Sequence, residues 1–235
     1  MGAISFLDTI LVPLSLFITI GYHAYLWHHL KHKPSHTTIG MNMLKRRSWL
    51  QFVVWMINFF FPRVWQGSEK KGTLAVQSLR NALMETMLTA TVTILIILAM
   101  AALTNNTLKV SNLFTSAFFG TQTGKTIVLK YGSASIFLVA SFLCSSMALG
   151  FLIDANFMVN ALGEFSINPR HTETIFERGF TLAFVGDRVL CMTFPLLFWM
   201  LGPVPAVVSS LALVWGLRER DFAGNLSRTM SKSCT

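Results

Sequence analysis

Four long apolar segments constrain the fold of this 235-residue chain more than any other feature. A helix needs about 20 mostly apolar residues to cross a membrane. The chain is 53% hydrophobic and only 12% charged, about half the charged share of a soluble domain. We therefore expect an all-α integral membrane protein with four transmembrane helices, at about 4–29, 74–103, 127–158 and 182–216.

A fifth apolar segment, WLQFVVWMINFFF at 49–61, has only thirteen residues and lies between KRR and PRVW. Its length favours an amphipathic helix in the membrane interface, between spans 1 and 2, over another span. We expect a single transmembrane domain, 1–217, with a basic loop at 30–73 and a polar tail at 218–235. Three prolines should kink the fourth span: Pro195, Pro203 and Pro205.

The distribution of basic residues predicts the orientation. Loop 30–73 holds eight Lys and Arg but one Glu, whereas loop 104–126 holds only Lys109 and Lys125. Loops rich in Lys and Arg stay in the cytosol, so loop 30–73 should be cytosolic and both termini lumenal. The excess of 19 Lys and Arg over 10 Asp and Glu fits such loops, and we expect no nucleic-acid partner.

Charged residues recur at a similar depth in several predicted spans, where they are costly and must face protein or water. One set could pair internally and hold the helices together: Arg80, Asp187, Arg188 and His23. In particular, we expect a contact between Arg80 and Asp187. Asp154 lies at the same depth and is kept as a candidate for a cation pathway.

Polar residues recur every four positions on the second span: Gln77, Asn81, Glu85, Thr89 and Thr93. At that spacing they form one slowly winding stripe on a helix. The stripe could face water or could join helices through side-chain hydrogen bonds. One packed four-helix bundle fills its own interior, so a pore needs several copies, in which Glu85 would repeat as a carboxylate ring.

Five of the six histidines lie in YHAYLWHHLKHKPSH, residues 22–36. His28 and His32 have the i, i+4 spacing of a helical metal pair, yet no Cys, Asp or Glu lies nearby to complete a site. A pH-dependent role or a solvated collar among Tyr, Trp and Lys are the alternatives. We expect no firm metal site and no cofactor, apart from permeant Ca²⁺ or other cations.

Several stretches in order resemble the plant membrane-protein family called domain of unknown function 599. They are LVP with YH, PSHTTIGMN, RRSWL, LAVQSLRNALM, LKY, ERGF, VGDR and PLLFWMLGP. LAVQSLRN is the most specific of these, and the resemblance covers most of residues 7–215. The chain departs from the family in a longer apolar stretch between Trp49 and Leu74, and in Asp187, where Asn is common.

Within this family the sequence is similar to a plant cation channel linked to defence. That resemblance implies a pentameric, calcium-permeable channel in the endoplasmic reticulum or another endomembrane. The alternatives are a small secondary transporter, favoured by the prolines of the fourth span, and a membrane scaffold. We do not expect an enzyme, because the polar residues form no convincing nucleophile–base or metal arrangement.

Overall fold

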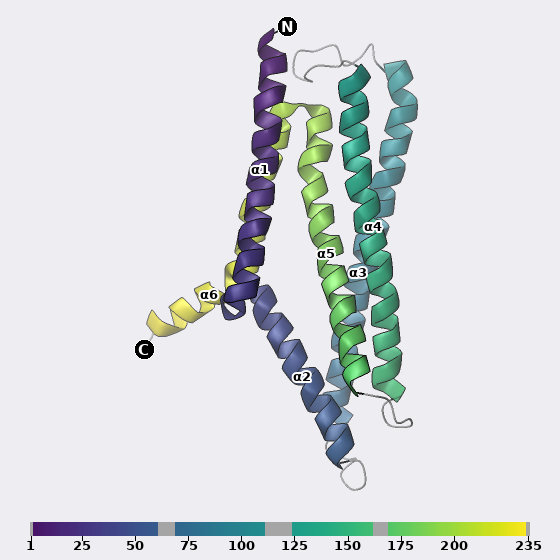
Figure 1. The fold of residues 1–235 in the computed structure, drawn as a ribbon, viewed down its shortest axis with the longest axis vertical. Helices are drawn as coiled ribbons and strands as arrows, with labels where there is room; N and C mark the ends of the chain where they lie inside the picture. Colours follow the sequence, from purple (N-terminus) through teal and green to yellow (C-terminus); the bar gives the residue numbers. More distant parts are fainter. Residues whose placement is uncertain (1, 61–68, 111–123, 162–168, 234–235) are drawn as a thin grey trace. The chain divides into compact units, whose positions relative to one another are not determined.

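The computed structural model describes residues 2–60, 69–110, 124–161 and 169–233, with side chains for residues 10–48, 51, 77–103, 128–158 and 171–222. The described chain is all-helical (Figure 1). Its elements are α1 (Gly2–His32), the short 3₁₀ helix η1 (Pro34–His36), α2 (Thr38–Phe60), α3 (Glu69–Val110), α4 (Gly124–Ala161), α5 (Pro169–Leu201) and α6 (Pro203–Ser233).

Four of the described helices are long and apolar enough to cross a membrane. These stretches are Ile10–His32 in α1, Gln77–Leu103 in α3, Val128–Met158 in α4 and His171–Leu201 in α5. The first three agree with the predicted segments. The expected all-α class and its four long apolar helices are therefore confirmed.

The predicted fourth segment, 182–216, is wrong as a single helix, because the chain divides it between α5 and α6 at Gly202. Gly202 has φ 153°, a conformation that side-chain-bearing residues rarely adopt. Pro203 follows as the first residue of α6, where its missing N–H is no loss. Pro195, by contrast, lies inside the continuous helix α5.

The helix expected at 49–61 is longer than predicted and starts at Thr38. Thr37 caps it, since its hydroxyl accepts the Gly40 N–H at 3.2 Å and its carbonyl accepts the Met41 N–H at 2.9 Å. A Cβ at Gly40 would overlap the Pro34 carbonyl. The motif PSHTTIGMN therefore encodes the tight turn before α2.

The chain forms two compact units, whose boundary falls within α2, α3, α4 and α5. The first unit comprises Met1–Leu44, Leu98–Phe137 and Cys191–Thr235. In it α1 and α6 lie side by side (Figure 1): Asp221 in the second half of α6 contacts Tyr22 in the second half of α1, and α6 also contacts η1, which follows α1. The two helices therefore run parallel.

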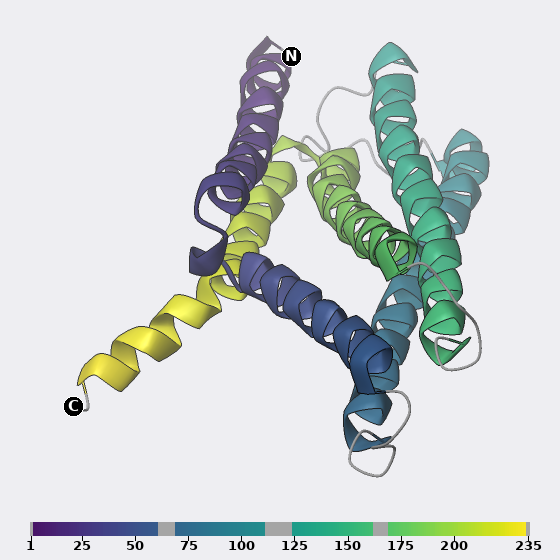
Figure 2. The same ribbon diagram turned by 60° about the horizontal axis from the view of Figure 1, so that its bottom comes forward.

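The second unit comprises Lys45–Ile97 and Leu138–Leu190. Within it α3, α4 and α5 pack side by side (Figure 2) around a core of Leu79, Leu152, Ala155 and Phe176. Small residues let α4 and α5 approach closely: a Cβ at Gly186 would lie 2.6 Å from the Ser145 hydroxyl, and the Ser141 hydroxyl donates to the Gly186 carbonyl at 2.8 Å.

Candidate functional site

The polar stripe on α3 passes from the surface of the chain into its interior. Gln77, Asn81 and Glu85 are exposed, Thr89 is half-buried and Thr93 is fully buried. The Thr89 hydroxyl donates to the Glu85 carbonyl at 3.1 Å, and the Thr93 hydroxyl donates to the Thr89 carbonyl at 2.7 Å. The two threonines thus satisfy their hydroxyls within α3, while the other three present polar groups outward.

The negative charge of Glu85 acts on Arg46 of α2, and both residues belong to the second unit. Burial lowers the pKa of the Arg46 guanidinium from its ordinary value, and the negative charge of Glu85 opposes that shift. The Arg46 guanidinium also lies 4.0 Å from the centre of the Phe180 ring on α5. Arg46 therefore packs α2 against α5 and lies within the electrostatic influence of Glu85 on α3.

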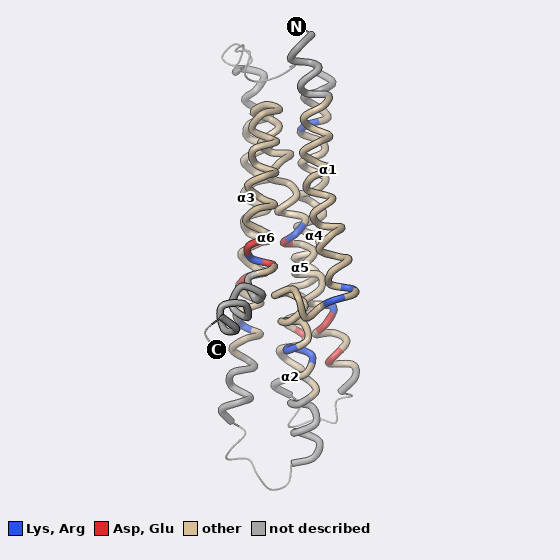
Figure 3. The backbone as a smooth tube through the Cα atoms, turned by 90° about the vertical axis from the view of Figure 1, so that its left-hand side faces the viewer, with Lys and Arg blue, Asp and Glu red and all other residues tan. Residues whose placement is uncertain are grey.

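The next residue, Arg47, holds α2 against the first turns of α5. Its Nε lies 2.7 Å from the Glu177 carboxylate and 3.6 Å from that of Glu173. The Gln51 amide donates to Glu173 at 3.4 Å, which extends the contact by one turn of α2. Figure 3 marks the charged positions along the backbone. We call Arg47, Gln51, Glu173 and Glu177 the α2–α5 contact.

The other predicted intramembrane charges differ in their exposure. Arg80 is exposed and forms no ion pair with another described residue, so the predicted contact with Asp187 is absent. The reason is that Leu79 occupies the core of the second unit, which turns Arg80 outward. Arg188 is buried, with its guanidinium 4.9 Å from the Phe184 ring centre; Asp187 is half-buried and Asp154 exposed.

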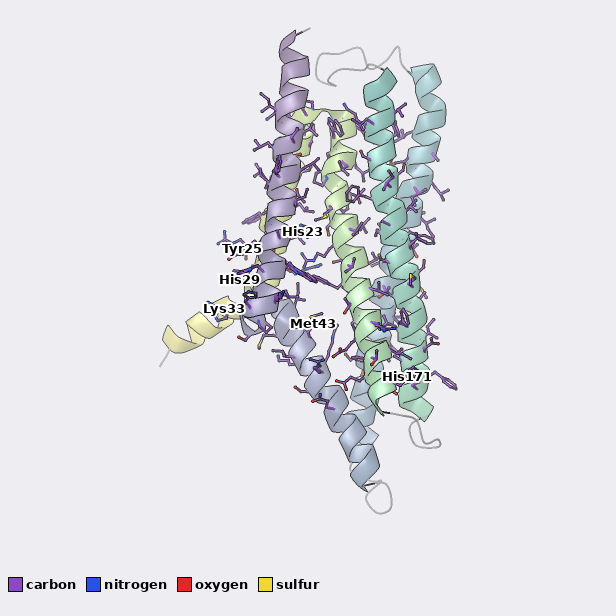
Figure 4. All side chains as sticks on the ribbon, in the orientation of Figure 1. His23, Tyr25, His29, Lys33, Met43 and His171 are labelled. Carbon is purple, nitrogen blue, oxygen red and sulfur yellow. The ribbon has the colours of Figure 1, made fainter. Side chains whose placement is uncertain are left out.

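The histidines of α1 occupy different surroundings (Figure 4). His23 is half-buried, and its Nδ1 lies 2.8 Å from the Thr19 carbonyl. His28 and His32 are exposed, with ring centres 4.4 Å apart. In the part of the chain with described side chains, no three His, Cys, Asp or Glu residues come together as a metal site would require.

Two contacts of the first unit escaped the sequence analysis. The Tyr22 hydroxyl donates to the Asp221 carboxylate at 2.6 Å, and both side chains are buried. Lys130 is only 5% exposed, and its Nζ lies 5.3 Å from the Trp199 ring centre, within cation–π range. The sequence motifs LKY and PLLFWMLGP contain Lys130 and Trp199, and they were the only indication in the sequence that these two residues matter.

Over the residues that the structure describes, these features define a class: an all-helical protein with four helices that could cross a membrane and that carry polar and charged residues. The chain belongs to the family described as protein of unknown function, DUF599, whose profile matches residues 10–226. No curated protein and no solved structure matches it. The family resemblance of the sequence motifs is therefore confirmed.

Proposed function

We propose that the chain is an integral membrane protein whose copies assemble into a cation channel. The observation that carries the proposal is the exposure of Glu85, with Gln77 and Asn81, on α3. Only 17% of the most apolar stretch of α3 is buried within the chain, the lowest share among the four candidate spans. A carboxylate on a span is costly in lipid, so this face of α3 should meet water, another copy or the countercharge of Arg46.

A symmetric assembly satisfies that requirement. Repetition of Glu85 around an axis would form a ring of carboxylates, and such rings favour cations over anions. Calcium prefers hard oxygen ligands, which the Glu85 carboxylate and the Asn81 and Gln77 amides can supply. Weak, repeated contacts of this kind let an ion leave as well as enter.

From the order of the sequence motifs we also infer a relationship to WeiTsing, a plant cation channel. This relationship supports a pentamer, permeability to calcium, a place in the endoplasmic reticulum or another endomembrane, and a role in plant defence. The partners of the chain are then the lipid bilayer and other copies of itself.

We propose in addition that α2 lies in the membrane interface with the basic loop on the cytosolic side. Its basic residues Lys45, Arg46 and Arg47 precede the apolar stretch that begins at Trp49. The expectation that both termini are lumenal depended on one helix at 182–216. The parallel packing of α6 on α1 favours a lumenal N-terminus and a C-terminus on the basic-loop side.

A second candidate function is a small secondary transporter. The break at Gly202, followed by Pro203, supports it, because interrupted helices often line the substrate sites of transporters. A membrane scaffold, which would use α2 and its basic residues to recruit partners, is the third reading.

Reconstitution of the purified full-length protein into planar bilayers tests the proposal. A channel gives unitary current steps carried by Ca²⁺, from particles whose mass corresponds to several copies. Saturable, solute-coupled flux without unitary steps would instead indicate the transporter. Multimeric particles with neither activity would leave only the scaffold and would contradict the channel.

A further inference from the structure

The parallel packing of α1 and α6 places two sets of basic residues, far apart in the sequence, in the same half of the helix pair. Lys31 lies in the last turn of α1 and Lys33 directly after it. Arg218 and Arg220 lie in the second half of α6, and all four side chains are exposed. We call these four residues the basic collar.

Specific contacts fix this arrangement in the first unit. The buried hydrogen bond from Tyr22 to Asp221 sets the register of the two helices. The Phe222 ring lies 6.2 Å from the Tyr25 ring and 6.0 Å from the His29 ring. Beyond this point α6 also contacts η1, which begins directly after Lys33.

Aromatic side chains accompany the collar on both helices. Trp215 is 70% exposed and lies one turn before Arg218, while Trp27 is 66% and Tyr25 52% exposed on α1. Exposed Trp and Tyr gather where lipid headgroups begin. Because an exposed Arg is costly among lipid tails, Arg218 also indicates that the headgroup layer starts at this depth.

The charge balance at the collar is positive. Glu219 is the one exposed acid between Arg218 and Arg220 on α6, and the Asp221 carboxylate is buried against the Tyr22 hydroxyl. Arg groups can bind phosphate oxygens in pairs, and Lys attracts them as a point charge. His28, His29 and His32 add ring N–H donors at the same end of α1.

We propose that the basic collar binds the phosphate headgroup of an anionic phospholipid. The lipid would lie against the paired ends of α1 and α6, with its phosphate between the arginines and lysines and its chains along the apolar surface before Trp215. This site is independent of the proposed cation pathway on α3, and it would hold in a channel, a transporter or a scaffold alike.

Native mass spectrometry of the purified full-length protein tests the site. Phosphatidylinositol and phosphatidylcholine with the same acyl chains are added separately, and the retained lipid is measured at equal activation energy. The test variant combines Lys31→Gln, Lys33→Gln, Arg218→Gln and Arg220→Gln. The control variant combines Lys45→Gln and Arg178→Gln, which remove two exposed cations of the second unit. A third variant, Arg218→Lys with Arg220→Lys, keeps the charge.

The wild type should retain phosphatidylinositol over phosphatidylcholine, and the test variant should lose about fivefold in affinity for each cation removed. The control and the charge-preserving variant should stay within about twofold of the wild type. Equal retention of both lipids by the wild type would overturn the proposal, as would equal loss in the control. If the test variant fails to fold, the variant Arg218→Lys with Arg220→Lys tests the proposal instead. This variant must still retain phosphatidylinositol over phosphatidylcholine. Displacement of the bound lipid by free inositol phosphate would contradict a lipid site.

Discussion

The Tyr22 hydroxyl donates a 2.6 Å hydrogen bond to the Asp221 carboxylate, across 199 positions of sequence. Asp221 is fully buried and Tyr22 is 8% exposed, so this bond lies inside the α1–α6 pair. It connects the YH motif of the first span to a segment that the sequence suggested was a polar tail.

Tyr22→Phe should destabilise the protein because it removes a donor from a buried carboxylate. A hydrogen bond to a charged group contributes about 1.5–3 kcal/mol. The melting temperature of the purified protein should fall by several degrees. Tyr25→Phe is the matched control, since Tyr25 is 52% exposed and should tolerate the same change. Equal melting temperatures for the two variants would show that the bond contributes nothing.

The parallel course of α1 and α6 makes a prediction about topology. If α1 crosses the membrane, the part of α6 beyond Asp221 must lie on the side of the basic loop, because α6 contacts η1, which follows α1 directly. In intact microsomes, protease should remove a C-terminal tag without detergent and leave an N-terminal tag protected. Protection of both tags would place both termini in the lumen, as the four spans predicted from the sequence require, and would contradict this topology.

The α2–α5 contact predicts local rather than global effects. Its Arg47 and Glu177 side chains are 57% and 44% exposed, and such pairs contribute only about 0.2–1 kcal/mol. Arg47→Gln should therefore leave the melting temperature almost unchanged but speed hydrogen exchange in α2. Lys45→Gln, two residues earlier, should leave hydrogen exchange in α2 unchanged. The double variant Arg47→Glu with Glu177→Arg should restore slow exchange. If Arg47→Gln, Lys45→Gln and the double variant all exchange at the wild-type rate, the α2–α5 contact does not hold α2 in place.

Because α4 and α5 approach closely at Gly186, a side chain at this position should lower the stability of the protein. A Cβ there would meet the Ser145 hydroxyl at 2.6 Å and the Ser145 backbone nitrogen at 3.2 Å. Gly186→Ala should cost about 1–3 kcal/mol of stability, as overpacking commonly does. Gly150→Ala on α4 is the control, because nothing lies within 4 Å of its Cβ. If Gly186→Ala is as stable as Gly150→Ala, α4 and α5 must lie farther apart at Gly186 than the structure shows.

The sequence predicted the helical class and three of the long apolar helices, because length and apolar content alone decide these features. It did not predict the break at Gly202, since hydropathy continues through 182–216 and only the backbone conformation interrupts it. The prolines indicated a disturbance, but Pro195 remained inside α5 while Pro203 began α6.

The site was predictable only within one helix. The spacing of Gln77, Asn81 and Glu85 indicated one face of α3, and all three are exposed. Contacts between helices were not predictable: equal depth suggested Arg80 with Asp187, whereas the charge of Glu85 acts on Arg46 and Lys130 lies near Trp199. Depth along a span says nothing about the rotation of a helix, which packing decides.

The electrostatic effect of Glu85 on Arg46 suggests a structural role for Glu85 that competes with the proposed channel role. Its negative charge raises the pKa of the Arg46 guanidinium against the lowering effect of burial, so Glu85→Gln should lower that pKa further. If this role dominates, Glu85→Gln should reduce assembly before it changes any current. Each variant must therefore be compared in particles of the same mass as the wild type.

The most direct test of the cation-channel proposal is the reversal potential of such size-matched particles, with Ca²⁺ on one side of a planar bilayer and K⁺ on the other. Loss of the Glu85 charge in Glu85→Gln should move the reversal potential toward that of K⁺ and lower the unitary Ca²⁺ current. Glu85→Lys should nearly abolish cation flux. An unchanged reversal potential and an unchanged unitary current in Glu85→Gln would contradict a carboxylate ring at this position.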